Sequence, residues 1–308
     1  MSEKTLHLMG TVITLWVQHP KGEELVDEAA AQLVDFEQRF SANAEDSALM
    51  AINHQAGIAP VKVEDDLFEL IVIGKEQSLI PESALNIAIG PLIQEWRVGF
   101  KDANYPSPER IQELLPLIDP SAIQIDTKEQ TVFLEKAGMA LDLGALAKGY
   151  FADKIIAFFK SEGAEAGFID LGGNVLTYGP APQREEGLWR IGIQNPFLPR
   201  GNAVAVVKVR EESVVTSGIY ERKFEWEGRT YHHIFDRQTG YPIETDVASL
   251  TIVSKSSLDG EIWTTRLFNQ QAADILTCLN QQEEIEGFVI TTDQQMAYSN
   301  GLKNKIDL

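Results

Sequence analysis

The chain has 308 residues, a hydrophobic fraction of 44% and a formal net charge of −20 at pH 7. It is long enough to bury a large core, and its composition is that of a globular protein. The negative charge argues against nucleic-acid and anionic-membrane partners, because both need a positive surface. An anionic ligand would therefore need local lysines, helix N-termini or a divalent cation.

Two absences narrow the class of protein further. Cys278 is the single cysteine, so an intramolecular disulfide and a cysteine-based metal cluster are both excluded. The first residues lack the basic and apolar regions of a signal peptide, and no run of about 18 apolar residues occurs. We expect a soluble cytoplasmic protein without membrane insertion, and the sequence leaves open a leader that has been removed.

The first part of the chain predicts strands and helices in turn. Residues 5–19 alternate as a strand does, with Met9-Gly10-Thr11 as a candidate β-bulge. Leu25, Ala29, Leu33 and Phe36 recur at helical spacing and predict an amphipathic helix over 22–40. Further helices are predicted over 48–53, 65–79 and 107–115, and a hairpin over 123–134.

The middle of the chain predicts a strand-to-helix junction. Residues 139–143 form a short apolar run, and Gly144 opens a predicted helix over 145–159. A helix N-terminus with Lys148 one turn in is suited to an anion, although ordinary helix capping is the simpler interpretation. The pattern is not a Walker A loop, and Gly172-Gly173, after a predicted strand over 167–171, is not a dinucleotide fingerprint.

A predicted hairpin follows, with strands over 220–226 and 229–235 and a Glu227-Gly228 turn. Polar loops, 216–218 and 236–240, flank it. His232, His233 and Asp236 gather at the end of the second strand, where a rigid support often carries catalytic groups. The alternative is a surface hairpin whose polar residues face water.

The last part predicts a strand over 248–254, helices over 256–268 and 270–279, and two short strands over 288–291 and 296–299. Ser256 and Asp259 form a capping pattern at the start of the first helix. Glu261 and Thr265 stand four residues apart, hence on one helix face, where both could reach Mg²⁺. The alternative is a solvated face with a threonine that bonds back to the helix backbone.

Together these motifs resemble one family. The matching segments, in chain order, are Met9-Gly10-Thr11, Phe40-Ser41 with Asp46-Ser47 and Asn53, 86–96, 141–148, 170–174, Thr216-Ser217-Gly218 with Tyr220, 233–236 with Thr239-Gly240, and 265–268. The chain is similar to ApbE-type FAD:protein FMN transferases from about residue 5 to 280.

The resemblance implies a fold and an activity. The expected fold is one α+β domain over 1–308, with mixed, antiparallel-rich sheets and flanking helices. The implied reaction is Mg²⁺-dependent cleavage of FAD: FMN passes to a threonine or serine hydroxyl of a client protein, and AMP leaves. A metal, a lysine and a base suffice, because phosphoryl transfer depends mainly on positioning and charge stabilisation.

The resemblance also implies the site residues. Glu261, Thr265 and the main-chain carbonyl of Ala145 would hold the metal. His233, with Asp236, would act on the client hydroxyl, and His233 is preferred to His232 because the family's histidine lies three residues before the aspartate. FAD would be bound by Met9, Asn43, Ala84, Leu85, Asn86, Asp142, Lys148, Asp170, Thr216, Ser217, Tyr220 and His233.

Three positions depart from the family pattern. Glu261 stands where the family usually has aspartate, and Asp259, the other candidate ligand, is out of helical phase with Thr265. Asn43 replaces an aromatic residue and Asn86 an aspartate, which puts flavin affinity and geometry in question. Two alternatives therefore stay open: an FAD pyrophosphatase that gives FMN and AMP, and a protein that binds FAD without turnover.

Overall fold

A long antiparallel sheet organises the molecule. The computed structural model describes residues 1–182 and 184–308. The eight strands cross the sheet in chain order, and they are β1 (Ser2–Leu8), β2 (Thr11–Gln18), β6 (Ala166–Leu171), β7 (Asn174–Tyr178), β10 (Ser213–Gly218), β13 (Val247–Ser254), β14 (Glu286–Thr291) and β15 (Met296–Tyr298). The α+β prediction is confirmed, and all strand pairs among the described residues are antiparallel.

The start of the sheet corrects one prediction. Residues 5–19 are not one strand with a bulge, because β1 and β2 pair as a hairpin that closes at Leu8 and Thr11. Met9 and Gly10 form its turn with φ angles of 53° and 70°. Two successive residues with positive φ make the tight turn that suits the right-handed twist of paired strands.

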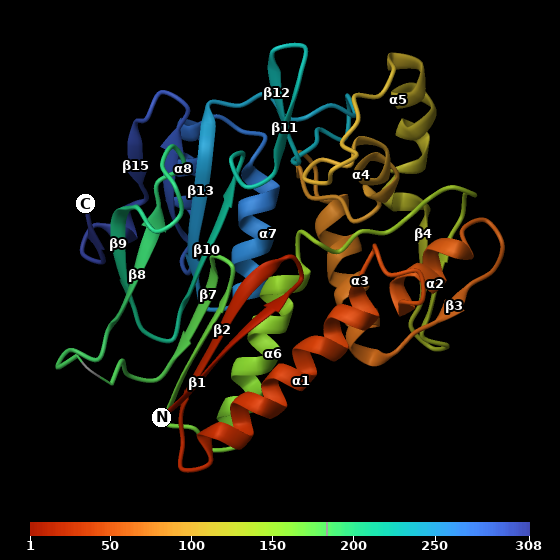
Figure 1. Ribbon diagram of the computed structural model, residues 1–308. Helices are drawn as coiled ribbons and strands as arrows, with labels where there is room; N and C mark the ends of the chain where they lie inside the picture. Colours follow the sequence, from red (N-terminus) through yellow and green to blue (C-terminus); the bar gives the residue numbers. More distant parts are fainter. Residues whose placement is uncertain (183) are drawn as a thin grey trace.

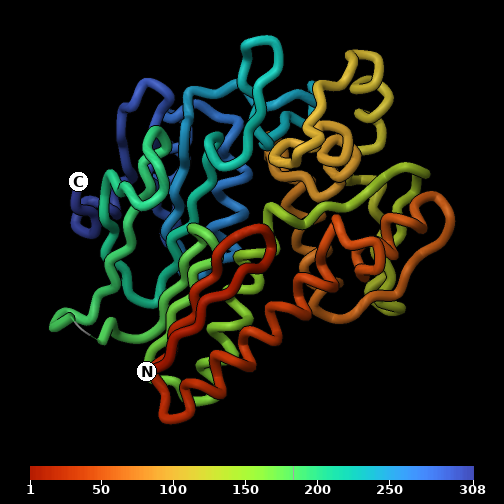
Figure 2. The backbone as a smooth tube through the Cα atoms, in the orientation of Figure 1, coloured from red at the N-terminus to blue at the C-terminus, as the bar shows by residue number. Residues whose placement is uncertain are grey.

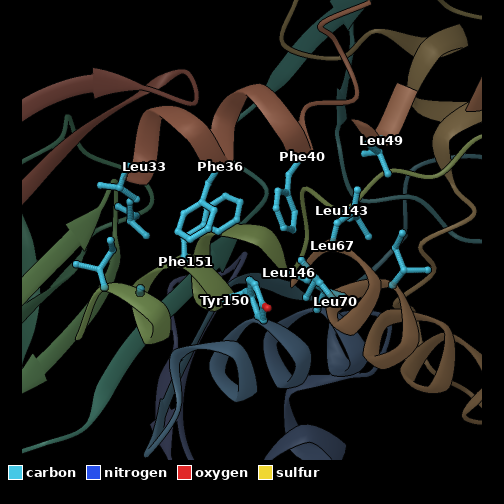
Figure 3. Packing of buried hydrophobic residues seen from close by; sticks show 14 of the residues in the cluster. Leu33, Phe36, Phe40, Leu49, Leu67, Leu70, Leu143, Leu146, Tyr150 and Phe151 are labelled. Atoms are coloured by element: carbon cyan, nitrogen blue, oxygen red, sulfur yellow. The ribbon is translucent and has the colours of Figure 1, made fainter. Parts of the chain in front are cut away.

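Three helices cover one face of the sheet: α1 (Gly22–Phe40), α6 (Ala147–Ser161) and α7 (Ser257–Leu267) (Figures 1 and 2). Alternate residues of β2, such as Ile13 and Leu15, point into this interface and are fully buried. Phe36 of α1 stacks on Phe151 of α6 with ring centroids 4.7 Å apart (Figure 3). This packing fixes α6, and so the start of that helix, against the sheet.

A small sheet packs on the opposite face. Its order is β16 (Ile306–Asp307), β9 (Ala203–Val209) and β8 (Trp189–Gln194), which leaves β8 as an outer strand. Val207 of β9 contributes to one apolar cluster with Val214 of β10 and Phe288 of β14. No pattern in the sequence had predicted β8, β9 or β16. They cover the β10–β14 part of the face.

A helical region stands beside the sheet (Figure 1). It contains α2 (Ala48–His54), α3 (Asp65–Leu79), α4 (Gly90–Trp96), α5 (Pro108–Leu114) and a sheet of β3 (Val61–Lys62), β5 (Thr131–Leu134) and β4 (Ile123–Asp126). The hairpin of β11 (Lys223–Trp226) and β12 (Arg229–His232) packs against this region through Trp96 of α4. The Trp96 indole Nε1–H also donates to the carbonyl of Gly240, after the hairpin, at 3.0 Å. The last helix, α8 (Ala272–Leu279), packs against β14.

Two local predictions are wrong for identifiable reasons. Residues 139–143 form no strand, because Leu141 is held by the side chain of Asn53 through bonds of 2.7 and 3.1 Å to its N–H and C=O. Thr216, Ser217 and Gly218 are not a loop but the end of β10, and they pair with β13. None of the helices among the described residues is long and apolar enough to cross a membrane.

Candidate functional site

The start of α6 carries three of the predicted residues. The Asp142 carboxylate accepts from the Gly144 N–H at 2.8 Å, and Ala145 and Lys148 follow on the next turn. In the part of the chain that the structure describes, no side chain caps this helix start. Uncapped N–H groups, the helix dipole and the Lys148 ammonium all favour a negatively charged ligand. Burial raises the pKa of Asp142, and the nearby Arg222 guanidinium opposes this shift.

A buried polar network joins α6 to α7. The Lys148 Nζ lies 3.7 Å from Glu261 Oε1, and the same oxygen accepts from the Asn174 amide at 2.8 Å. The Ser257 hydroxyl donates to Asn174 Oδ1 at 2.6 Å. Glu261 is buried, whereas about a third of the Lys148 side chain is exposed. A buried carboxylate is thus fixed beside a lysine that solvent and ligand can reach.

Asp259 and Glu261, the two acidic residues of α7 considered as metal ligands, have different surroundings. Asp259 lies near Asp153 and Glu284, and their charges add to burial in raising its pKa. Asp153 itself binds the N–H groups of Ser257 and Leu258, at 2.8 and 2.9 Å. Asp259 therefore lies among acidic neighbours. Glu261 is the α7 carboxylate that contacts Lys148 of α6, and this contact region is the α6–α7 junction.

The donors at this junction suit a hard cation. Glu261 Oε2 and the Thr265 hydroxyl have no hydrogen-bond partner among residues 1–182 and 184–308. Carboxylate, hydroxyl and carbonyl oxygens are the ligands that Mg²⁺ prefers. In that part of the chain, no three His, Cys, Asp or Glu side chains form a cluster that could hold a metal. A cation here would depend on Glu261, Thr265, a main-chain carbonyl and oxygens from the substrate.

His233 lies immediately after β12, and one of its two ring nitrogens is hydrogen-bonded to the backbone. Its Nδ1 is 3.2 Å from the Arg222 carbonyl, which can only accept, so Nδ1 carries the proton and Nε2 is left as an acceptor. Burial lowers the pKa of His233 to about 4, and the charges of Arg222, His232 and Lys148 act in the same direction. His233 is therefore neutral near pH 7, in the form that can take a proton.

His232 and Asp236 are engaged in the local backbone. His232 Nε2 donates to the Ile243 carbonyl at 3.0 Å, and its Nδ1 accepts from the Ile234 N–H at 3.2 Å. The Asp236 carboxylate accepts from the Gln238 N–H at 2.7 Å and shapes the turn that ends at Gly240. Among the described residues, no hydrogen bond joins Asp236 to either histidine.

A second group of predicted residues lines a cavity of about 480 Å³ on the other face of the sheet. Asp170, Thr216 and Tyr220 belong to it. The Asp170 carboxylate accepts from the Gly173 N–H at 2.7 Å, and Thr216 bonds Thr251 at 2.8 Å. Strand alternation places Ser217 on the opposite face. Burial raises the pKa of Asp170, and Lys148 and Arg200 oppose the shift, so the Lys148 charge acts on both regions.

The remaining predicted residues come from separate segments of the chain. Asn86 is buried: its amide donates to the Ile118 carbonyl at 2.8 Å and its oxygen accepts from the Ala88 N–H at 2.9 Å. Ala84 donates its N–H to the Arg266 carbonyl at 3.2 Å, and Leu85 is fully buried. Met9 lies in the β1–β2 turn, and Asn43 is exposed.

The sequence analysis missed two residues at this site. Asn174 orients Glu261, and Arg222 supplies both the carbonyl that fixes His233 and a positive charge near Asp142. Asn174 ends the matching segment 170–174 but had no role of its own in the prediction. Arg222 ends the run 216–222, and no pattern in that run predicts that its carbonyl would fix His233.

The sequence and the fold were compared with those of known proteins. A family model described as the ApbE family matches residues 9–289. The chain belongs to the ApbE family. The FAD:protein FMN transferase of Klebsiella pneumoniae is 38% identical over 293 residues, covering 95% of this chain and 90% of the relative. The protein of the same name from Treponema pallidum is 35% identical, with 97% and 87% covered.

Solved ApbE structures share the fold along the whole chain. The ApbE protein of Thermotoga maritima superposes with a TM-score of 0.88 at 25% identity, with 99% of this chain and 98% of the other covered. The flavinyl transferase ApbE of Pseudomonas stutzeri gives a TM-score of 0.83 at 26% identity, with 99% and 96% covered. The predicted family is therefore confirmed.

Proposed function

We propose that this chain is an enzyme that transfers FMN from FAD to a threonine or serine hydroxyl of a client protein. The carrying observation is the junction of α6 and α7, where Lys148 lies 3.7 Å from buried Glu261 at an uncapped helix start. In a protein of net charge −20, this junction collects the groups that a pyrophosphate needs. The names of the ApbE relatives supply the substrate and the class of acceptor.

The proposed reaction is a phosphoryl transfer. The client hydroxyl oxygen attacks the phosphorus of the FMN half of FAD and forms a new P–O bond. The P–O bond to the bridging oxygen breaks, and AMP leaves with its electron pair. The hydroxyl proton passes to His233 Nε2, the nitrogen that the Arg222 contact leaves unprotonated. The product is a phosphoester between FMN and the client.

Each residue at the junction has a proposed part. Lys148 and the N–H groups at the start of α6 bind phosphate oxygens and hold the reacting phosphorus in place. Asn174 fixes the orientation of Glu261. Glu261, Thr265 and the Ala145 carbonyl would hold Mg²⁺, which when bound neutralises negative charge on the phosphates. Asp142, six residues before Lys148, accepts from the Gly144 N–H, and the charge of Lys148 acts on Asp170.

The deciding experiment measures products with and without an acceptor. The chain is incubated with FAD and Mg²⁺, alone and with candidate client fragments, and AMP and protein masses are measured. Transfer predicts Mg²⁺-dependent AMP release together with one FMN phosphoester on a client threonine or serine. AMP and free FMN without a modified client would identify a pyrophosphatase instead. FAD binding without AMP release would identify a binding protein and reject both enzymatic functions.

A further inference from the structure

Strand β8 (Trp189–Gln194) has one edge that no other described strand covers. It is the outer strand of the order β16-β9-β8. Trp189, Arg190, Ile191, Gly192 and Gln194 all border the 480 Å³ cavity. Because successive side chains of a strand point to opposite faces, a cavity lined by consecutive residues borders the strand's backbone as well as its side chains. The free edge of β8 therefore forms one wall of this cavity.

The neighbouring strand identifies which backbone groups lie on that edge. Lys208 of β9 donates its N–H to Lys305, so its backbone groups point toward β16 and away from β8. Arg190 is the β8 residue opposite Lys208. In an antiparallel pair, two directly opposed residues either both hydrogen-bond to each other or both point their backbone groups away from each other. Because the backbone groups of Lys208 point away from β8, the N–H and C=O of Arg190 point away from β9, to the free edge of β8. By the same alternation, those of Gly192 do as well.

The cavity floor offers an apolar surface next to the proposed reaction site. Phe168 stacks on Trp189 with ring centroids 5.7 Å apart, and Trp16 packs edge-on against Trp189 at 5.5 Å. Asp170 and Gly173 line the same cavity, and the Lys148 charge opposes the rise that burial causes in the pKa of Asp170. The volume lies within the range of about 300–1,000 Å³ usual for ligand sites. The cavity thus extends from β8 to Asp170 at the end of β6 and to Gly172 and Gly173 in the turn before β7.

We propose that the client protein docks by adding an extended segment to the free edge of β8, with an apolar side chain on the Phe168–Trp189 floor. The backbone groups of Arg190 and Gly192 pair with the client backbone, and the acceptor hydroxyl lies toward Lys148 and His233. Main-chain pairing supplies affinity, and the floor supplies selectivity. This proposal rests on the proposed transferase function and specifies how its acceptor is held. It gives the β8 wall of the cavity to the client and leaves Asp170 and Thr216, on the strands of the long sheet, to FAD.

The test compares two substitutions at one position. Arg190→Pro removes the outward N–H and adds a ring on the free edge, and proline is tolerated there because the ladder with β9 does not use that N–H. Arg190→Ala removes the same side chain, including its 3.3 Å contact to Glu186, but keeps the N–H. Both variants are checked for FAD binding and thermal unfolding, so that a misfolded protein is recognised.

The probe is a synthetic library of seven-residue peptides with a central threonine and varied flanks, incubated with FAD and Mg²⁺. For peptides that the native chain modifies, Arg190→Pro should raise the KM for peptide at least about 10-fold with kcat within about 2-fold. Arg190→Ala should leave both nearly unchanged. Peptide alone should slow hydrogen exchange at the Arg190 and Gly192 amides and leave Ile191, which pairs with β9, unaffected.

The outcomes separate this proposal from the transferase function. Equal KM values for native and Arg190→Pro chains, or no added protection at Arg190 and Gly192, would overturn docking on β8 while transfer stands. A folded native chain that binds FAD and modifies no peptide would count against transfer to extended acceptors, and with it against this docking mode. If Arg190→Ala is as damaging as Arg190→Pro, the arginine side chain and not the strand edge binds the client.

Discussion

Glu261 and Asp259 are two residues apart on α7 and face different surroundings. Glu261 is buried beside Lys148 and Asn174, whereas Asp259 lies near Asp153 and Glu284. We expect Glu261→Gln to lower Mg²⁺-dependent AMP release at least about 100-fold, because it removes the α7 carboxylate that is proposed to hold the metal. Asp259→Asn should stay within about 3-fold of native. Initial rates over a series of Mg²⁺ concentrations test this, and equal losses in both variants would contradict it.

His233 and His232 form a second matched pair. A positioned base contributes about 10²–10⁴-fold in rate, so His233→Ala should lower FMN transfer by that order. FAD affinity should stay within a few-fold, because a base acts mainly on the transition state. His232→Ala should lower the melting temperature, since both its nitrogens bind backbone, and should lower the rate much less. A stable His233→Ala chain that transfers FMN at the native rate would reject the base assignment.

The burial of His233 also predicts a pH dependence. Its folded-state pKa is about 4, against about 6.5 in the unfolded chain. Between these values the unfolded state binds more protons, so this group makes the free energy of unfolding rise with pH from about 4 to 6.5. His233→Asn should therefore lose less stability than the native chain when the pH falls from 7 to 4.5. Urea unfolding of both chains at the two pH values measures this, and parallel losses would contradict it.

Two helices meet at a glycine. A Cβ on Gly149 of α6 would lie 2.5 Å from the Ser257 carbonyl oxygen and 2.8 Å from Glu261 Cγ. Glycine to alanine inside a helix normally stabilises by about 1 kcal/mol. Here we expect the opposite sign, a loss of about 1–3 kcal/mol, because α7 must move away from α6. The same shift separates Glu261 from Lys148 and should lower AMP release. Urea unfolding and initial rates measure both effects, and a more stable Gly149→Ala chain would show that the contact can relax.

Periodicity predicted the helices well and the loops between them less well. The helix over 22–40 and the one over 65–79 match α1 and α3 because their apolar residues repeat at helical spacing. Residues 139–143 looked like a strand because they are apolar, but the side chain of Asn53 takes the place of a neighbouring strand. Pairing across 88 positions of sequence leaves no local signal.

At the scale of the whole molecule, the sequence motifs located the junction but not how the pieces meet. Lys148 and Glu261 were predicted separately, by resemblance, and the fold brings them to 3.7 Å. Asn174 lies in a matching segment, but its contact with Glu261 and the contact of the Arg222 carbonyl with His233 follow from tertiary packing. The free edge of β8 likewise depends on which strands form the small sheet, which local patterns do not encode.

The overall charge leads to a prediction with a definite sign. A net charge of −20 repels the anionic pyrophosphate of FAD, so salt should help association. From 10 to 150 mM ionic strength the Debye length falls from about 30 to about 8 Å. We expect the association rate constant of FAD to rise a few-fold over this range at one fixed Mg²⁺ concentration, measured by stopped-flow flavin fluorescence. Riboflavin, which carries no phosphate, should show little change. A rate that falls with salt would mean that a local positive field dominates.

The order of strands in the long sheet has a consequence for synthesis on the ribosome. Each strand from β1 to β15 lies next to the one that precedes it in that sheet, so a growing chain can extend the sheet outward without inserting a strand between two others. Glu261 and Thr265 lie beyond β13 and emerge late. A nascent chain that has exposed Lys148 but not α7 has an anion-binding helix start without its acidic partner. Under the proposed mechanism FAD cleavage needs α7, so a nascent chain acquires it only after the strands from β1 to β13 have emerged.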